Sequence, residues 1–118
     1  KKDDNLCKDF YYQLVSRVLK PKVIVDYERE PFVMETGDVR ITFDKNLRWA
    51  SPYNDIFSND VASRYVFPPG QMVMEVKFTK LLPGIVKRLL QTSGSGQTAV
   101  SKYVLCCDAQ EYLNGIRF

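Results

Sequence analysis

The stretch Met74-Glu75-Val76-Lys77-Phe78 decides the fold class, because its apolar and charged residues alternate. Alternation with a period of two is typical of a β-strand whose two faces differ in character. Glu75 and Lys77 then share one face, and the apolar side chains share the other. In an antiparallel sheet the apolar face normally packs on the core and the charged face meets water. The sequence therefore predicts an antiparallel sheet with one charged face.

Two earlier segments repeat this polarity and add arginines to the charged face. The strand predicted over residues 39–44 carries Arg40 on its polar face, and the strand predicted over residues 22–30 carries Arg29. Strands that curl into a closed or nearly closed barrel, with these faces inward, bring both arginines to Lys77 in a polar lumen. We therefore expect an anion-binding tunnel.

Three cations in one lumen require a nearby negative charge. Two like charges about 6 Å apart repel by about 3 kcal/mol at an effective dielectric of about 20, and desolvation adds to that cost. Asp44 and Glu75 are able to supply the negative charge as internal salt bridges. A bound polyanion is the alternative, since guanidinium groups bind phosphate oxygens in pairs. Both explanations stay open at this point.

Length and composition predict one soluble domain over residues 1–118. Apolar residues make up 45% and charged residues 26% of the chain, which is ordinary for a globular protein. The net charge of +3 is too small to require a nucleic-acid partner. No apolar run approaches the roughly 20 residues that span a bilayer. The absence of histidine excludes imidazole chemistry and a Cys/His zinc site within this chain.

The cysteines favour a reducing compartment. Cys7, Cys106 and Cys107 form an odd set with an adjacent pair, which does not suit a secreted disulfide scaffold. No secretory signal is visible at the amino terminus. We expect a cytoplasmic location, with any membrane attachment supplied by other segments or partners.

Helices are expected on both sides of the strands. An amphipathic pattern over residues 4–19 predicts a first helix, whose Phe10-Tyr11-Tyr12 cluster is expected to pack against the sheet. Pro83 suits the first position of a second helix that ends at Gln91. The aromatic residues of the irregular segment 46–69 are expected to pack on the barrel exterior.

A third helix is predicted over residues 99–113, with Thr98 as its cap. Ser101 and Lys102 then lie in its first turn, where a bound phosphate would offset the cost of a lysine beside the positive end of the helix dipole. A surface lysine that tolerates the position is an equally good explanation. The preceding residues 93–96 are interpreted as a flexible loop, since a phosphate-binding Walker loop needs a different order of residues.

Four motifs, in this order, resemble those of the VTC domain, the polyphosphate polymerase domain of the triphosphate tunnel superfamily. They are Tyr27-x-Arg29-x-x-Phe32, residues 38–44, residues 74–78 and Ser101-Lys102-Tyr103. The resemblance covers roughly residues 20–103 and corresponds to the carboxyl-terminal half of the domain. It implies an α+β fold in which an antiparallel β-barrel of the tunnel type is flanked by helices, with a partial tunnel in this chain.

The resemblance also implies a metal-dependent phosphotransferase that moves the γ-phosphate of ATP onto a growing polyphosphate chain. Tyr27 would contact a phosphate, and Glu75 would hold Mn²⁺ or Mg²⁺. The remaining phosphate-binding residues would be Arg29, Arg40, Lys77, Ser101 and Lys102, of which Arg29, Arg40 and Lys77 are the candidate catalytic residues.

Two departures from the family pattern affect these expectations. The strands of the amino-terminal half are not seen, so that half is an expected partner and catalysis by this chain alone is in question. A lysine that the family often carries before its Ser-Lys pair is replaced by Thr98, Ala99 and Val100. The alternatives are a non-catalytic module that binds polyphosphate or an inositol phosphate, and a structural interaction domain whose cations are all paired with carboxylates.

Overall fold

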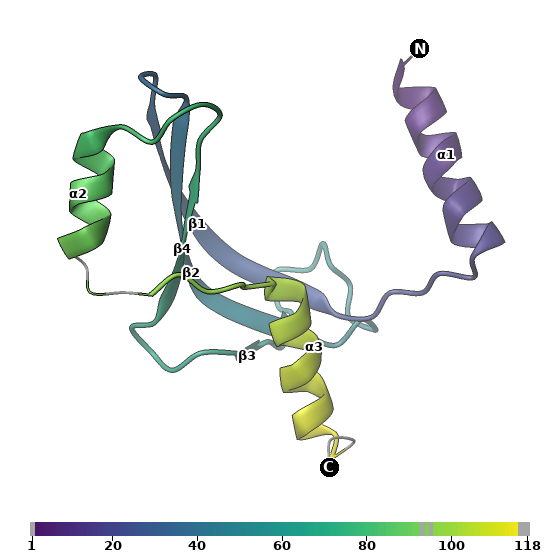
Figure 1. Cartoon of the computed structure of the whole chain (residues 1–118). Coiled ribbons are helices and arrows are strands. Elements are labelled where there is room, and N and C mark those ends of the chain that lie inside the picture. The colour runs from purple at the N-terminus through teal and green to yellow at the C-terminus, as the bar shows by residue number, and fades with distance from the viewer. Residues whose placement is uncertain (1, 93, 95, 116–118) are drawn as a thin grey trace.

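The computed structural model describes residues 2–92, 94 and 96–115 and has an α+β architecture (Figure 1). The elements are α1 (Lys2–Ser16), β1 (Ile24–Met34), β2 (Val39–Ala50), β3 (Arg64–Tyr65), β4 (Met72–Lys77), α2 (Gly84–Thr92) and α3 (Lys102–Leu113). Antiparallel strands and helices therefore occur as expected. None of the helices in these ranges has the length and apolar character needed to span a bilayer.

The strand β2 is the centre of a four-stranded sheet. It pairs antiparallel with β1 along one edge, and with β4 and the short β3 along the other. Within the described residues β1 and β4 each pair with β2 and with no other strand. The sheet of these residues is therefore open and does not close into a barrel, so the expected barrel with a partial tunnel is not confirmed. Closure requires the two outer strands to pair through further strands, which these residues do not supply.

A β-bulge in β2 decides which side chains reach the core. Asp26 of β1 pairs with Arg48 and Glu28 pairs with Lys45, so β2 has one more residue than β1 between these two pairs. Asn46 lies in this interval and has a φ of 52°. An extra residue shifts the alternation of side chains along the bulged strand. As a result Asp44 and Leu47 are both buried and lie on the same side of the sheet. We call this side the inner face.

The inner face becomes apolar beyond the bulge, where α3 covers it. Leu47, Trp49 and Cys106 form the buried core there, with Val25 and Leu105 packed against them. Trp49 was expected on the exterior, which is wrong. It belongs to β2 and not to the loop, and the bulge directs it inward. Other aromatic residues of the loop, Tyr53 and Phe57, are exposed.

The outer face of the sheet packs against α2. Val39 of β2 and Val86 of α2 are buried there. The rings of Phe32 and Phe43 pack edge to face, with their centroids 5.8 Å apart. The turn between β1 and β2 also fits closely against the segment that precedes α2. Gly37 has a φ of 79°, and a Cβ at this position would lie 2.7 Å from the carbonyl oxygen of Leu81. Glycine is therefore required at this turn.

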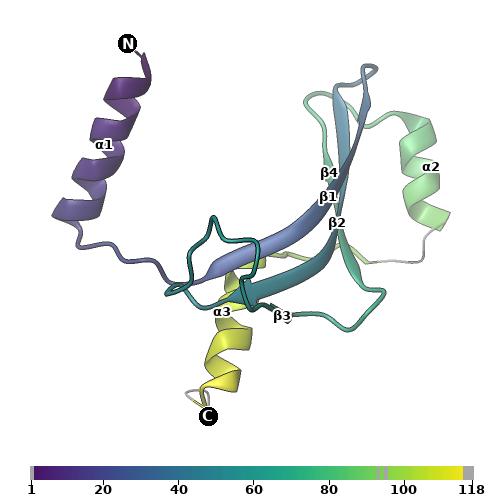
Figure 2. The same cartoon turned by 180° about the vertical axis from the view of Figure 1, so that it is seen from behind.

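The first helix stands apart from the rest of the molecule (Figures 1 and 2). In the described part of the chain, no Cα atom of α1 lies within 8 Å of a Cα atom of another helix or strand. Phe10 is 64% exposed, and Tyr11 and Tyr12 are similarly open to solvent. The expectation that these aromatics pack on the sheet is therefore wrong. An amphipathic pattern predicts that a helix has an apolar face but does not specify which surface covers it.

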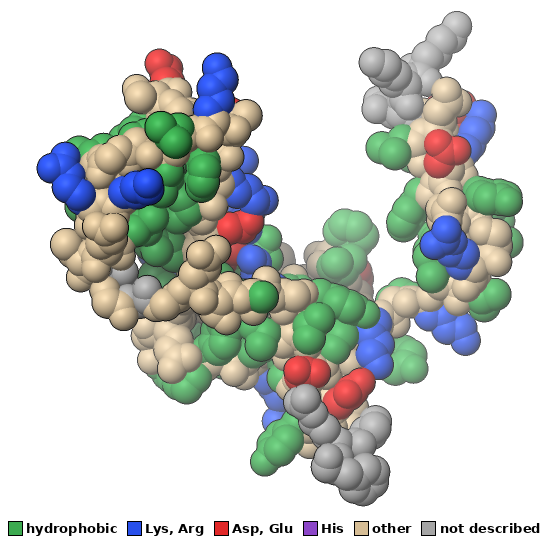
Figure 3. Space-filling model, in the orientation of Figure 1, with side chains coloured by type: hydrophobic (Ala, Val, Ile, Leu, Met, Phe, Trp, Pro, Cys, Tyr) green, Lys and Arg blue, Asp and Glu red, His purple; other side chains and the backbone are tan. Residues whose placement is uncertain are grey.

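The chain is more open than a compact domain of its size. Its radius of gyration is 18.2 Å, against about 13–14 Å expected for a compact fold of this length. Its accessible surface is 9990 Å², against roughly 6600 Å² for a folded monomer of this mass. Figure 3 shows apolar side chains on the surface of α1. Much apolar area is thus left uncovered by the chain itself.

The third helix begins later than expected. Ser101, and not Thr98, is its N-cap, with its side chain accepting a hydrogen bond from the backbone nitrogen of Val104 at 3.3 Å. Lys102 is thus the first helical residue. Of the loop predicted over residues 93–96, Ser93 and Ser95 lie outside the described residues.

Candidate functional site: a cationic inner face beside α3

Strand register places the candidate cations on the inner face. Arg40 of β2 pairs with Lys77 of β4, and Arg29 of β1 pairs with Asp44. Directly paired residues of antiparallel strands point to the same side. Because Arg40 and Asp44 are four residues apart on β2, before the bulge, all of these side chains share one face. The face is open and not an enclosed lumen, since the Lys77 side chain is 71% exposed.

Asp44 is the centre of a buried ion cluster that joins three elements. Its carboxylate, 1% exposed, accepts hydrogen bonds from Arg29 Nε at 2.7 Å and Nη2 at 2.9 Å. Lys102 Nζ, from the first turn of α3, lies 2.6 Å from Oδ2. The Arg29 hydrogen bonds, helped by Lys102 and opposed by burial, lower the pKa of Asp44 to about 2. The hydrogen bonding to Asp44 also raises the pKa of Arg29.

Tyr27 lies beneath both cations of this cluster. The guanidinium carbon of Arg29 is 5.3 Å from the ring centroid, and Lys102 Nζ is 5.1 Å from it. A cation within about 6 Å of an aromatic face is attracted by the ring quadrupole. The contacts fasten the amino-terminal end of α3 to the inner face. They also offset the unfavourable position of a lysine at a helix amino terminus.

A second, more exposed pair lies on β4. Lys77 Nζ is 3.0 Å from Glu75 Oε1, and this contact lowers the pKa of the Glu75 carboxyl. Both side chains reach solvent, so the pair contributes at most about 1 kcal/mol to stability. Such a pair opens at little cost when a competing ligand approaches.

Arg40 differs from the other cations of the face. Within the part of the chain that the structure describes, it forms no hydrogen bond or ion pair. Its neighbour on the same face, Thr42, is 4% exposed, and the Thr42 Oγ1 atom has no hydrogen-bond partner among these residues. Counting only the described residues, the inner face thus carries an unpaired cation and an unpaired buried hydroxyl two residues apart.

A model of the VTC domain family matches residues 1–110. The chain belongs to the VTC domain family. The match extends beyond residues 20–103, where the sequence motifs lie, and membership implies a polyphosphate-related function. Comparison with curated proteins and with solved structures gives no match.

In this VTC domain the structure brings most of the candidate residues together on the inner face. The exception is Ser101, whose hydroxyl caps α3. Tyr27, Arg29 and Lys102 meet around one carboxylate, and Arg40 lies beside Lys77 on the same sheet face. Thr42 was not among the predicted residues, although its place between Arg40 and Asp44 on the strand face was a visible signal.

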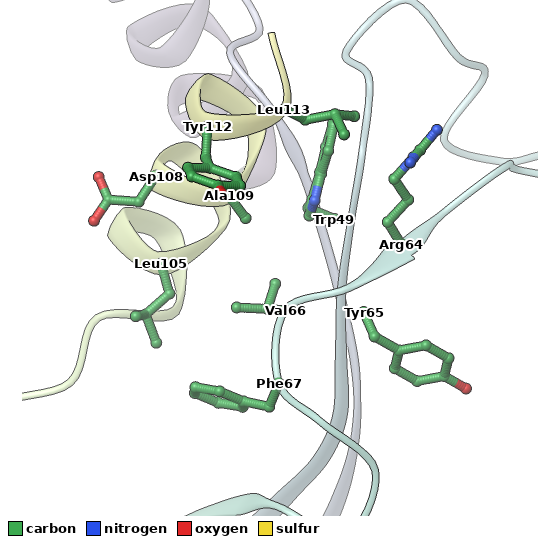
Figure 4. Close-up of a pocket in the computed structure, with 10 residues that line it drawn as sticks. All are labelled: Trp49, Arg64, Tyr65, Val66, Phe67, Leu105, Asp108, Ala109, Tyr112 and Leu113. Atoms are coloured by element: carbon green, nitrogen blue, oxygen red, sulfur yellow. The ribbon is translucent and has the colours of Figure 1, made fainter. Parts of the chain in front are cut away.

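One cavity of the VTC domain lies apart from these charges. It has a volume of about 740 Å³ and lies between α3 and the β3 region (Figure 4). Aromatic and aliphatic side chains make up most of its lining, which contains Trp49, Arg64, Tyr65, Val66, Phe67, Leu105, Asp108, Ala109, Tyr112 and Leu113. None of the cations of the inner face is among them, so this cavity is not the expected phosphate site.

Carboxylates suitable for a divalent metal are few on the inner face. Among the described residues no group of three or more Cys, Asp and Glu side chains is arranged to hold an ion. Asp44 is committed to Arg29 and Lys102. Glu75, by contrast, is paired with the exposed Lys77. Its carboxylate oxygens are of the kind that Mn²⁺ and Mg²⁺ accept as ligands.

Proposed function

We propose that this VTC domain binds the phosphates of ATP and of a polyphosphate chain on its inner face. We further propose that it serves the transfer of the γ-phosphate of ATP to the end of that chain. The observation that carries the proposal is the surplus of cations on the face, where Arg40 has no ion-pair partner among the residues that the structure describes. Arg29, Arg40, Lys77 and Lys102 outnumber Asp44 and Glu75 there.

This charge arrangement suits phosphoryl transfer. The reaction breaks the bond between the γ-phosphorus and the β–γ bridging oxygen of ATP, releases ADP, and forms a bond from the γ-phosphorus to a terminal phosphate oxygen of the acceptor. It demands alignment of these oxygens and stabilisation of spread negative charge, more than acid–base chemistry by the protein. Arg40 and Lys77 are the residues with donors available for phosphate. Arg29 and Lys102 contribute the donors that Asp44 leaves unused.

Glu75 fits one position in the coordination sphere of Mn²⁺ or Mg²⁺. The ion would neutralise phosphate charge and orient the transferring group. One carboxylate does not make a protein cage, so phosphate oxygens and water would complete the ligand set. Metal binding is therefore expected to depend on phosphate. When Glu75 leaves Lys77 for the metal, the ammonium of Lys77 becomes available to the phosphate chain.

A non-catalytic module that binds polyphosphate or an inositol phosphate is the second candidate. Two observations favour it: the sheet is open, and the buried Asp44 already occupies Arg29 and Lys102. An open face binds an anion but exposes the reacting groups to water. Consumption of ATP that depends on the metal separates the two functions.

The binding test is calorimetric titration of the chain with sodium tripolyphosphate. Arg40→Gln removes the unpaired charge and is expected to weaken binding about tenfold, the value of one charge-assisted hydrogen bond. Arg88→Gln is the matched control, because Arg88 is exposed on α2, which packs on the opposite face. Equal losses in both variants, or none in Arg40→Gln, would contradict phosphate binding at the inner face.

The catalytic test follows polyphosphate formation from ATP and Mn²⁺ by phosphorus NMR. Synthesis that requires the metal and falls in Arg40→Gln is expected for the phosphotransferase. Tripolyphosphate binding without any ATP consumption would favour the binding module.

A further inference from the structure

The hydroxyl of Thr42 is a buried polar group that has no hydrogen-bond partner among the described residues. Thr42 is 4% exposed. Buried hydroxyl groups in folded proteins are normally hydrogen-bonded, because desolvation without a partner is unfavourable. A valine has nearly the same shape and favours strands as well. Packing alone therefore does not account for a threonine at this position.

The neighbours of Thr42 are the charged groups of the inner face. Glu75 is its direct partner on β4, which places the two Cβ atoms about 4.5–5.5 Å apart. Arg40 precedes it by two residues on the same face, and Asp44 follows by two. The unpaired cation therefore lies on one side of the hydroxyl, and the Arg29–Asp44–Lys102 cluster on the other.

We propose that Thr42 Oγ1 is a phosphate-binding hydroxyl that donates a hydrogen bond to a phosphate oxygen lying between Arg40 and the Arg29–Lys102 pair. This inference rests on the proposed function and adds a ligand to that site. A hydroxyl is able to donate a hydrogen bond to an anionic oxygen. Such a charge-assisted hydrogen bond is stronger in a site from which water is excluded than in water. The phosphate chain would thus be held by a neutral donor between two groups of cations.

Access to the hydroxyl is provided by the Glu75–Lys77 pair. The pair lies on the strand that faces Thr42, and both side chains are partly open to solvent. A phosphate chain that attracts Lys77, and a metal ion that attracts Glu75, would separate the two side chains. Their separation uncovers the β4 side of Thr42, so the hydroxyl becomes accessible only as the phosphate arrives.

The test compares Thr42→Val with Thr42→Ser by titration with tripolyphosphate and by thermal unfolding without ligand. Thr42→Val is expected to weaken binding about tenfold, since it deletes one hydrogen bond to a charged acceptor. Its melting temperature without ligand is expected to equal or exceed that of the unmodified chain, because the unpaired hydroxyl is gone. Thr42→Ser keeps the hydroxyl and is expected to bind within about threefold of the unmodified chain.

A purely structural threonine would give the opposite pattern. Thr42→Val would then melt at a lower temperature and bind tripolyphosphate as tightly as the unmodified chain, and this result overturns the inference. If Thr42→Val does not fold, Thr42→Ala replaces it, and binding by Thr42→Ala equal to that by Thr42→Ser overturns the inference. If the unmodified chain itself does not bind tripolyphosphate, the proposed function fails together with this inference.

Discussion

Asp44 shows at the scale of one residue how a buried charge is kept ionised. Its carboxylate is almost fully buried, yet Arg29 and Lys102 both contact it directly. The contacts lower its pKa to about 2 against an ordinary value of 3.8. Removing one partner of a buried pair is costly, because the remaining charges lose their compensation. Asp44 thus connects the sheet to α3 through charge and not through apolar packing.

The stability of the chain is expected to depend on pH through Asp44. A depressed carboxyl pKa stabilises the folded state above the unfolded value of about 4, and this contribution of about 2 kcal/mol is lost as the pH falls through about 2. In urea unfolding, Asp44→Asn should therefore be less stable than the unmodified chain at pH 6, and the difference should shrink toward pH 2. The control is Glu30→Gln, at an exposed pair with Lys45. A difference that does not change with pH would contradict this role.

At the scale of elements, two local backbone features determine how the sheet meets its neighbours. The bulge at Asn46 makes β2 direct both Asp44 and Trp49 to the inner face. The turn at Gly37 places the β1–β2 hairpin against the segment before α2. The periodicity of the sequence predicted the strands, and the glycine predicted the turn. A bulge leaves no comparable signal, because its extra residue interrupts the alternation from which strands are predicted.

Gly37→Ala is expected to destabilise the chain more than Gly70→Ala. Both glycines have a positive φ, of 79° and 87°, so alanine is strained by about 1–2 kcal/mol at either position. Only at Gly37 does the added Cβ meet a neighbouring backbone atom, the carbonyl oxygen of Leu81. Chemical unfolding of both variants measures the difference. Equal losses of stability would show that the turn does not press against this segment.

At the scale of the whole molecule, the chain leaves unusually large surfaces uncovered. The outer strands β1 and β4 have free edges within the described residues, and α1 has no packing partner there. Free strand edges and apolar helix faces both favour association with another chain. A protein with these features is held together by two separate small cores on opposite faces of one sheet. Cooperative stability is expected to come from these cores alone.

The double variant Phe10→Gln/Val15→Gln is expected to leave the free energy of unfolding within about 0.5 kcal/mol of the unmodified value, as for surface positions. Leu47→Ala, in the buried cluster with Trp49, should by contrast cost about 2–5 kcal/mol. Sedimentation at increasing concentration should show less association of the double variant than of the unmodified chain. A large loss of stability in the double variant would indicate that α1 packs on the body in solution.

The sequence by itself determined the period-two strands, the glycine turn and the presence of Arg29, Arg40 and Lys77 on faces of like polarity, because these follow from local backbone geometry. It also carried the motifs of the VTC domain. Only the tertiary structure decided that, among the described residues, the sheet stays open, α1 is unpacked, and Asp44 binds Arg29 and Lys102 while Arg40 is left unpaired. Each of these features depends on contacts between residues that are far apart in the sequence. The alternation of residues along a strand predicts which face a cation occupies, but not whether a carboxylate of the chain or an external phosphate binds it.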